Sequence, residues 1–207
     1  AHPTGTLTIA GATYSTRHIL TPHLPAFAAA YPHIKVNLSL QNYTVDLVAE
    51  SVDLAFRIGE PKGNTLIAKK CGDVCLAMTA APSFLKKYGR PVSIDDLPDF
   101  PCLLDTTPKG ANHWPISMHR KINYVFEAND GEIIRQMTLA GVGISMVPSF
   151  FVDDDVRDGK LVRLFEEELD VRMGVHFVLP QRKQITSNAR TFVEFVGPRI
   201  NAEQSLL

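Results

Sequence analysis

Arg57 is the residue whose place in the sequence points most directly to chemistry. It lies near the end of a dense apolar run over residues 52–58, a pattern typical of a buried strand that closes a strand–helix–strand unit. In open α/β sheets the carboxyl ends of such strands face the ligand crevice. A guanidinium there either forms a structural ion pair, for which Asp53, Glu60 and Asp105 are candidate partners, or holds a ligand carboxylate through two parallel hydrogen bonds.

The sequence carries no recognisable catalytic set. The Gly-x-Ser-x-Gly and His-Glu-x-x-His motifs are absent, as are the glycine-rich loops that bind phosphates or dinucleotides. The seven histidines have no metal-ligand spacing. We therefore expect a protein that is not an enzyme and that holds neither a metal nor a cofactor.

The three cysteines, Cys71, Cys75 and Cys102, are too few for a disulfide framework. The first two are separated by three residues, whereas redox and zinc pairs are separated by two. We interpret all three as small apolar residues in strands, with a thiol switch as the alternative.

Length and composition set broad limits. A chain of 207 residues with 45% hydrophobic and 21% charged residues fits one large or two small globular domains. The formal net charge of −1 gives no basic excess, so direct nucleic-acid binding is not expected. The sequence contains no apolar stretch near the roughly 20 residues of a membrane span.

The elements that must position Arg57 follow from hydrophobic periodicity. The first part of the chain predicts a β-α-β-α-β order and hence a parallel sheet with right-handed crossovers. The expected strands are residues 6–10, 34–40 and 52–58, and the expected helices are residues 20–31, kinked early by Pro22 and Pro25, and residues 44–51, with Thr44 as N-cap.

The later part of the chain continues the α/β pattern. Its helix signal is clearest after Asn129, which has capping-box spacing to Glu132. The remaining expected strands are an interrupted β segment over 66–79, strands over 101–104, 143–148, 161–164 and 172–179, and a hairpin over 114–126. The remaining expected helices are residues 81–88, 149–156 and an amphipathic helix over 188–200.

Several motifs follow one another in a specific order. They are residues 5–9, 20–32, 46–59, 66–70, 82–85, 89–91, 96–97, 140–148, 159–162 and 191–195. Each motif is degenerate, but their order and spacing are specific and cover nearly the whole chain. With these motifs the chain resembles the effector-binding (co-inducer) domain of LysR-type transcriptional regulators, with the N-terminal DNA-binding segment missing.

The resemblance implies an α/β fold of two Rossmann-like subdomains joined by two crossover strands, as in type 2 periplasmic binding proteins. Subdomain I would comprise residues 1–75 plus 178–207, and subdomain II residues 76–177, with a ligand cleft between them. The crossovers are expected near residues 75–79 and 174–179.

The resemblance also implies that loops at helix starts near Ser15, Thr44 and Asp130 bind the ligand. Their hydroxyl and amide groups have a simpler role as helix caps, and Asp130 would either cap a helix or bind a ligand amino or hydroxyl group. Tyr43 and Trp114 are candidates for an aromatic wall. The expected ligand-binding residues are Thr13, Ser15, Thr16, Asn42, Tyr43, Thr44, Arg57, Asp105, Asn129 and Asp130.

We therefore expect a cytoplasmic ligand-sensing domain of a bacterial regulator that binds a small metabolite, an organic acid, and so alters DNA binding by the full-length protein. The resemblance implies an antiparallel homodimer, a tetramer in the full-length protein, and DNA contact only through the missing N-terminal domain, with no membrane association. Residues 27–31 and 84–88 are candidate dimer contacts. The alternatives are an exported type 2 solute-binding protein, an enzyme on the same fold and a cysteine-based redox sensor.

Overall fold

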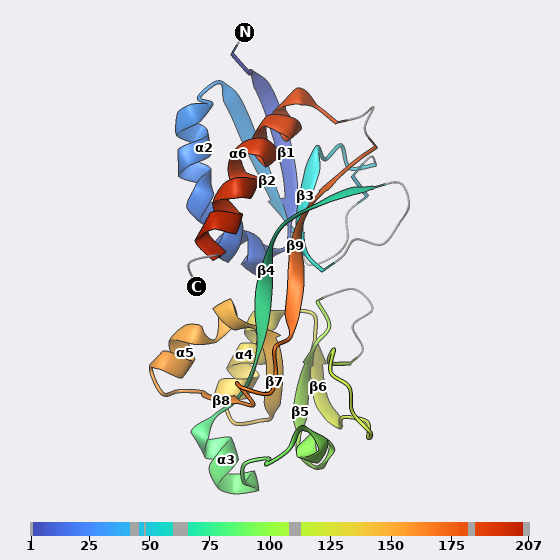
Figure 1. Cartoon of the computed structure of the whole chain (residues 1–207), viewed down its shortest axis with the longest axis vertical. Helices are drawn as coiled ribbons and strands as arrows, with labels where there is room; N and C mark the ends of the chain where they lie inside the picture. Colours follow the sequence, from blue (N-terminus) through green and yellow to red (C-terminus); the bar gives the residue numbers. More distant parts are fainter. Residues whose placement is uncertain are drawn as a thin grey trace. The chain divides into compact units, whose positions relative to one another are not determined.

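The computed structural model describes residues 2–41, 46–47, 49–59, 66–107, 113–181 and 185–204. The chain divides into two compact units, unit 1 (Ala1–Asp73 and Met173–Leu207) and unit 2 (Val74–Arg172). It leaves unit 1 within the long strand β4 (Ile67–Ala80) and returns at the start of β9 (Arg172–Leu179) (Figure 1). The second boundary precedes the expected one by five residues, because β9 already pairs with the unit 1 sheet at Val175.

The sheet of unit 1 has the strand order β2-β1-β3-β9-β4. The strands not yet given are β1 (Gly5–Gly11), β2 (Ile34–Leu40) and β3 (Leu54–Ile58). The predicted parallel opening is confirmed, since β1 is parallel to both β2 and β3. The sheet as a whole is mixed, because β9 runs antiparallel to β3.

The predicted early kink before the first main helix is confirmed. Short turns of different pitch precede α2, and Pro22 and Pro25 each occupy an opening position of a helical segment, where a missing N–H is tolerated. The helical segments of unit 1 are α1 (Thr13–Ser15), the π-helical η1 (Thr16–Leu20), the 3-10 helix η2 (Thr21–His23), α2 (Leu24–Ala30) and α6 (Ser187–Gln204).

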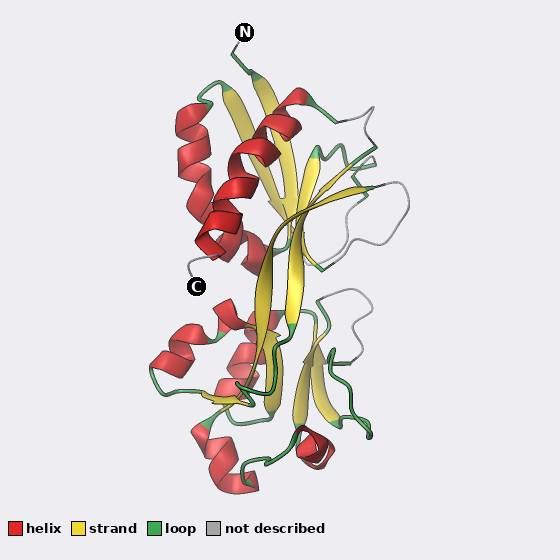
Figure 2. Ribbon diagram, in the orientation of Figure 1, coloured by secondary structure: helices red, strands yellow, loops and turns green. Residues whose placement is uncertain are grey.

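Helices α2 and α6 lie side by side against one face of the unit 1 sheet (Figure 2). Their contact is aromatic: Phe27 of α2 meets Phe192 of α6 edge-on, with ring centroids 4.8 Å apart. Phe192 also meets Phe177 of β9, which packs beside Phe56 of β3. These four rings are almost fully buried, so Phe56 of β3 and Phe177 of β9 are committed to the core on the face of α2 and α6.

The opposite face of the sheet carries a smaller apolar cluster that includes Leu47, Val52 and Ala55. The helix predicted over residues 44–51 is wrong for the described residues, since 47 and 49–51 form turns. The Asp46 carboxylate accepts the N–H of Ala49 at 3.0 Å, and the carbonyl of Leu47 accepts the N–H of Val52 at 2.8 Å. These hydrogen bonds close a compact turn, and the turn places the Leu47 side chain in the apolar cluster. The predicted N-cap, Thr44, lies outside the described residues.

Unit 2 has the strand order β4-β7-β5-β6, and β8 pairs with β4. Its strands besides β4 are β5 (Cys102–Asp105), β6 (Tyr124–Ala128), β7 (Ile144–Pro148) and β8 (Val162–Leu164). β5 is parallel to both β6 and β7, whereas β4 is antiparallel to β7 and β8. The carboxyl ends of β5, β6 and β7 therefore share one edge.

Helical segments flank the unit 2 sheet (Figure 2). They are α3 (Pro82–Tyr88), η3 (Ile94–Asp99), α4 (Gly131–Leu139), η4 (Ser149–Phe151) and α5 (Asp153–Arg157). The hairpin predicted over residues 114–126 is wrong. Residues 113–123 form no strand, and the following strand β6 pairs in parallel with β5.

Several aromatic residues that were candidates for surface roles lie in the core. Phe27 and Phe84 are almost fully buried, whereas residues 28–30 and 86–88 of the two candidate dimer segments are exposed. Trp114 is also buried; it packs against Tyr124, whose hydroxyl accepts the Trp114 backbone N–H at 2.8 Å. Trp114 is therefore a packing residue and not a ligand wall.

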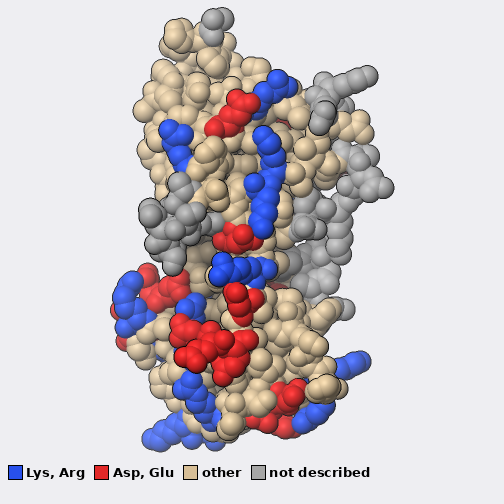
Figure 3. Space-filling view, in the orientation of Figure 1, with Lys and Arg blue, Asp and Glu red and all other residues tan. Residues whose placement is uncertain are grey.

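Among the described residues there is no helix with the length and hydropathy needed to cross a membrane. On the face of the described chain seen in Figure 3, acidic and basic side chains are interspersed and do not form a continuous basic stripe.

Candidate functional site

The carboxyl ends of β1, β2 and β3 meet at one edge of unit 1. Gly11, at the end of β1, pairs with Leu40 of β2 and Phe56 of β3. Gln41 follows β2 directly, and its N–H donates to the Gly11 carbonyl at 2.9 Å. Arg57 follows Phe56. The register thus brings together three segments at the edge where open α/β sheets bind ligands.

Thr13, Ser15 and Thr16 come directly after β1, and Ser15 is at the N-cap position of η1 but makes no side-chain capping bond. Ala12 is the N-cap of the three-residue α1 and makes no side-chain capping bond. The Ser15 hydroxyl lies 3.4 Å from the Ala12 carbonyl. The capping alternative for these three residues is therefore wrong, and the pattern that suggested it reflects the close turn from β1 into α1 and η1.

Thr16 is the most distinctive residue of this edge. It is fully buried, and its Oγ1 has no hydrogen-bond partner among the described residues. The hydroxyl lies against the backbone of Gly11, since a Cβ placed on Gly11 would be only 2.2 Å from Thr16 Oγ1. Gln41 Oε1 is likewise buried and unpartnered in the described part. Two polar atoms thus remain unsatisfied at one edge, which is unusual for buried groups.

Arg57 lies half-buried on β3, and burial lowers the pKa of its guanidinium. Of the partners considered for it, Asp53 accepts the backbone N–H of Thr8 at 2.7 Å, and Glu60 lies outside the described residues. The residue directly opposite Arg57 in the sheet is His176 of β9. The sequence pattern did not reveal this neighbour.

Asp105, Asn129 and Asp130 meet at the corresponding edge of unit 2. Asp105 ends β5 opposite Ala128, the last residue of β6, and the Thr106 N–H continues the pairing with a 2.8 Å bond to the Ala128 carbonyl. Asn129 and Asp130 follow at once. The parallel pairing therefore brings two carboxylates, 25 positions apart in sequence, to one edge.

Asp105 is held in a buried turn. Its carboxylate accepts the Thr107 N–H at 2.8 Å and also the Thr107 hydroxyl. Burial raises the pKa of Asp105, the Thr107 bonds oppose that shift, and the charge of Asp130 adds to it. The ionised carboxylate of Asp105 is therefore stabilised by any partner that supplies a hydrogen-bond donor or a positive charge.

Asp130 is the N-cap of α4. Its Oδ1 accepts the N–H groups of Glu132 at 2.9 Å and Ile133 at 3.2 Å. This corrects the predicted capping box, which placed the cap one residue earlier at Asn129. Asn129 is exposed and precedes the cap. The second carboxylate oxygen of Asp130 makes none of these capping bonds, so Asp130 serves as a cap and still presents an acceptor.

The predicted ligand set is thus distributed over both units. Thr13, Ser15, Thr16 and Arg57 belong to unit 1, whereas Asp105, Asn129 and Asp130 belong to unit 2. Asn42, Tyr43 and Thr44 lie outside the described residues. The sequence analysis did not identify Gly11, Gln41 or His176 as site residues. Of these three, only Gly11 could have been found from the sequence, because a glycine at a strand end indicates a close approach to the backbone.

The described residues hold no group of three or more His, Cys, Asp and Glu side chains arranged to bind a metal ion. The three cysteines form no disulfide; Cys71 and Cys102 are buried and Cys75 is exposed. Burial raises the pKa of both the Cys71 and the Cys102 thiol to about 12.

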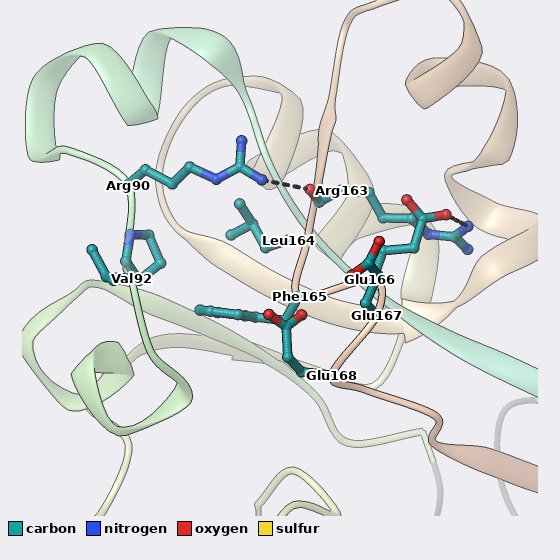
Figure 4. A pocket seen from close by; sticks show the side chains of 9 residues that line it. Arg90, Val92, Arg163, Leu164, Phe165, Glu166, Glu167 and Glu168 are labelled. Carbon is teal, nitrogen blue, oxygen red and sulfur yellow. Dashed lines mark hydrogen bonds and ion pairs between the residues drawn. The ribbon is translucent and has the colours of Figure 1, made fainter.

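A separate groove of ≈ 480 Å³ lies within unit 2, between residues 90–92 and 163–168 (Figure 4). Arg90 bridges it weakly, with a 3.4 Å bond to the Arg163 carbonyl. The side chains of Glu166, Glu167 and Glu168 lie along its other side. It shares no residue with the two strand edges described above.

Comparison with known proteins identifies the family. The family model for the LysR substrate binding domain matches residues 1–200. The chain belongs to this family. It is 32% identical to the HTH-type transcriptional regulator CrgA of Neisseria meningitidis serogroup C over 199 residues, which are 94% of this chain and 67% of CrgA. It is 30% identical to the HTH-type regulator DmlR of Escherichia coli K12 over 203 residues, 94% of this chain and 65% of DmlR.

Solved structures agree. The CrgA regulatory domain superposes with a TM-score of 0.80 at 32% identity, covering 96% of this chain and all of that domain. The effector domain of AmpR from Pseudomonas aeruginosa, at 21% identity, shares the fold with a TM-score of 0.77, covering 97% of this chain and 98% of that one. The chain is therefore the effector-binding domain of a LysR-type regulator, with the type 2 periplasmic-binding-protein-like fold. It spans about two thirds of the length of the curated relatives.

Proposed function

We propose that this domain senses a small organic acid, which binds at the carboxyl ends of the parallel strands. The observation that carries the proposal is Thr16 Oγ1, a buried hydroxyl at the edge of unit 1 without a partner among the described residues. An unsatisfied buried polar group costs about 1–3 kcal/mol. A ligand oxygen that completes its hydrogen bonding would recover this free energy on binding.

The charges at the two edges suggest how a ligand would be oriented. Unit 1 offers the Arg57 guanidinium and the Thr16 hydroxyl, which suit a carboxylate. Unit 2 offers Asp105 and Asp130, which repel a second carboxylate but suit a hydroxyl or amino group. A hydroxy acid or an amino acid fits this arrangement better than a simple dicarboxylate does.

In the intact regulator, we propose that the ligand shifts the equilibrium between two arrangements of the units. A ligand changes such an equilibrium only by its difference in affinity for the two states. A difference of about 1–3 kcal/mol, or roughly 5- to 150-fold, is sufficient for regulation. The proposal includes a cytoplasmic location, DNA contact through a separate N-terminal domain and no enzymatic turnover, in keeping with relatives that are transcriptional regulators.

We further propose that the domain pairs as an antiparallel homodimer, which would assemble into a tetramer in the full-length protein. Strand β2 supports this proposal, because it is at the edge of the unit 1 sheet and exposes Leu38 and Leu40 by 37% and 40%. Exposed leucines on an open edge strand favour contact with another chain. The exposed residues of the segments 27–31 and 84–88 are further candidates for this contact.

Thermal unfolding in the presence of small hydroxy acids, amino acids and dicarboxylic acids tests the proposal. A ligand at 100 times its Kd stabilises the folded state by about 2.7 kcal/mol. Thr16→Val keeps the side-chain shape but removes the hydroxyl, and it should weaken binding by roughly tenfold or more. Thr191→Val is the matched control, because the Thr191 hydroxyl bonds within α6 to the Ser187 carbonyl at 3.0 Å. Equal ligand responses in the parent and in Thr16→Val would refute the site.

A further inference from the structure

Arg57 and His176 lie directly opposite each other on β3 and β9. The Gly59 N–H donates to the Gly174 carbonyl at 2.8 Å, so alternate pairs, including Arg57 and His176, are the hydrogen-bonded pairs of this antiparallel ladder. Residues opposite each other in such a ladder project from the same face, with Cα atoms about 5.5 Å apart. The guanidinium and the imidazole therefore emerge together on the face away from α2 and α6.

His176 is buried, with 6% of its surface exposed, and its Nδ1 atom has no hydrogen-bond partner among the described residues. A buried imidazole nitrogen without a partner is uncommon, because the desolvated polar atom gains nothing in return. The packing of β9 does not itself require a histidine at position 176. A Val or Phe there would continue the apolar pattern of β9 and would avoid the cost of burying an unpaired nitrogen.

The next pair on the same face consists of Gly59 and Gly174, which have no side chains. The imidazole leans over Gly174, since a Cβ placed there would be 2.6 Å from His176 Cε1 and 3.4 Å from Lys70 Cε. The Lys70 ammonium itself pairs with Asp73 at 2.7 Å. The absence of a side chain at Gly174 thus makes room for the imidazole, and the alkyl part of Lys70 packs on the other side of the same position.

The surroundings on the other side are apolar. The preceding pair on this face is Ala55 and Val178, both members of the small buried cluster with Leu47 and Val52. A hydrogen bond in such low-dielectric surroundings is electrostatically stronger than one in water. Burial also lowers the pKa of Arg57, because desolvation disfavours the charged guanidinium.

We propose that Arg57 and His176 together anchor a carboxylate of the effector. The guanidinium has five donors and engages the two carboxylate oxygens in parallel, while the imidazole donates a ring N–H to one of them. This assignment rests on the proposed sensing function and deepens it, because it names the anionic group of the ligand and adds His176 as a binding residue. The face that receives the anion is built from unit 1 alone.

Small anions test the anchor directly. Protein labelled with ¹³C and ¹⁵N in histidine is titrated with acetate and succinate, and with acetamide and succinamide as neutral analogues, at constant ionic strength maintained with chloride. The titration extends to about 10 mM, beyond the weak end of metabolite affinities. We expect saturable shifts of the His176 ring signals with the carboxylates and none with the amides or chloride.

The variants are chosen to keep the fold. Arg57→Lys keeps the positive charge but loses the planar fork, and it should weaken carboxylate binding by about tenfold. His176→Asn keeps a side-chain donor and should bind more tightly than His176→Phe, which has none. His119→Phe is the control, because His119 is an exposed histidine of unit 2. Melting temperatures measured without ligand identify any variant that fails to fold.

The outcomes separate this inference from the proposed function. If Arg57→Lys and His176→Phe both bind within twofold of the parent while Thr16→Val does not, the anchor is overturned and the sensing site stands. If the two anchor variants lose binding and Thr16→Val keeps it, the anchor stands and the Thr16 edge is excluded. Equal shifts with acetate and acetamide, or no shift with either carboxylate, also overturn the anchor.

Discussion

The guanidinium of Arg135 donates two hydrogen bonds to the carboxylate of Asp155, from Nε to Oδ2 at 2.5 Å and from Nη2 to Oδ1 at 2.9 Å. Arg135 is on α4 and Asp155 on α5, so the pair ties together two helices of unit 2. The Asp155 side chain is only 4% exposed, and Arg135 also pairs with Glu132 at 2.8 Å. The hydrogen bonds that Arg135 donates to Asp155 are the main cause that raises the pKa of Arg135.

Arg135→Met should therefore destabilise unit 2 strongly. It leaves the Asp155 carboxylate buried without its cation, a change that typically costs about 3–5 kcal/mol. Arg157→Met provides the contrast, because Arg157 and Asp154 are 71% and 82% exposed and such surface pairs contribute at most about 1 kcal/mol. Urea denaturation followed by circular dichroism measures both. A similar small loss for the two variants would mean that Asp155 is solvated in solution.

Gly11→Ala should destabilise unit 1, because the new Cβ would meet Thr16 Oγ1 at 2.2 Å. Overpacking of this kind costs about 1–3 kcal/mol. Thr16→Ala removes the clashing oxygen and leaves Thr16 Cβ 3.4 Å from the new methyl group. The double variant should thus be more stable than Gly11→Ala alone, a non-additive result that thermal unfolding of all four proteins would reveal. Additive losses would show that the two residues are not in contact.

Asp105→Asn should stabilise the domain at neutral pH. Burial raises the pKa of Asp105 in the folded state, so above the ordinary value of 3.8 the folded chain holds a proton that the unfolded chain has lost. The contribution of Asp105 to the free energy of unfolding therefore falls as pH rises from 3.8 through the raised pKa of the folded state. At neutral pH the ionised carboxylate destabilises the folded protein. Asparagine keeps an acceptor for Thr107 and carries no charge.

The pH dependence distinguishes this effect from a simple packing gain. The stability advantage of Asp105→Asn should shrink as pH falls toward 3.8 and disappear below it, where both states of the parent are protonated. Denaturation curves recorded across the acidic range give the comparison. An advantage that does not change with pH would argue against a raised pKa.

Iodoacetamide at neutral pH should label Cys75 and spare Cys71 and Cys102 in the folded protein. Cys75 is exposed, whereas burial keeps the other two thiols protonated, with pKa values of about 12. Mass spectrometry should find one adduct per chain, three adducts in urea and none in folded Cys75→Ser. Rapid labelling of Cys71 or Cys102 would show that a thiol described as buried is reactive, and it would favour the redox-sensor alternative.

The sequence predicted the parts of the fold that depend on local pattern. Alternation gave β1 and β2, the prolines gave the early turns before α2, and the spacing of Phe192, Val193 and Val196 gave the buried face of α6. Local pattern failed where side chains close a turn instead. At residues 46–52 the Asp46 carboxylate accepts the backbone N–H of Ala49, whereas in a helix that N–H would donate to a backbone carbonyl.

The site was predicted only in part, because its geometry depends on pairing between distant segments. Arg57 and Asp130 stand out in sequence as a charge at a strand end and a helix cap. His176 does not, since its role follows from a register that joins residues more than 100 positions apart. The Thr16 hydroxyl is similar: a threonine after a strand is typical of a cap, and only its contact with Gly11 shows otherwise.

Strand β9 lies between β3 and β4 in the sheet of unit 1, although it comes about 100 residues after β4 begins. On a ribosome, unit 2 is therefore made in one piece and can complete its strand pairing while unit 1 still lacks an interior strand. Nascent chains that stop before Arg172 would present the unpaired edge of β3 and the buried faces of Phe56 and Phe27 to the cell. Chaperone dependence during synthesis should accordingly fall sharply once residues 173–207 have emerged.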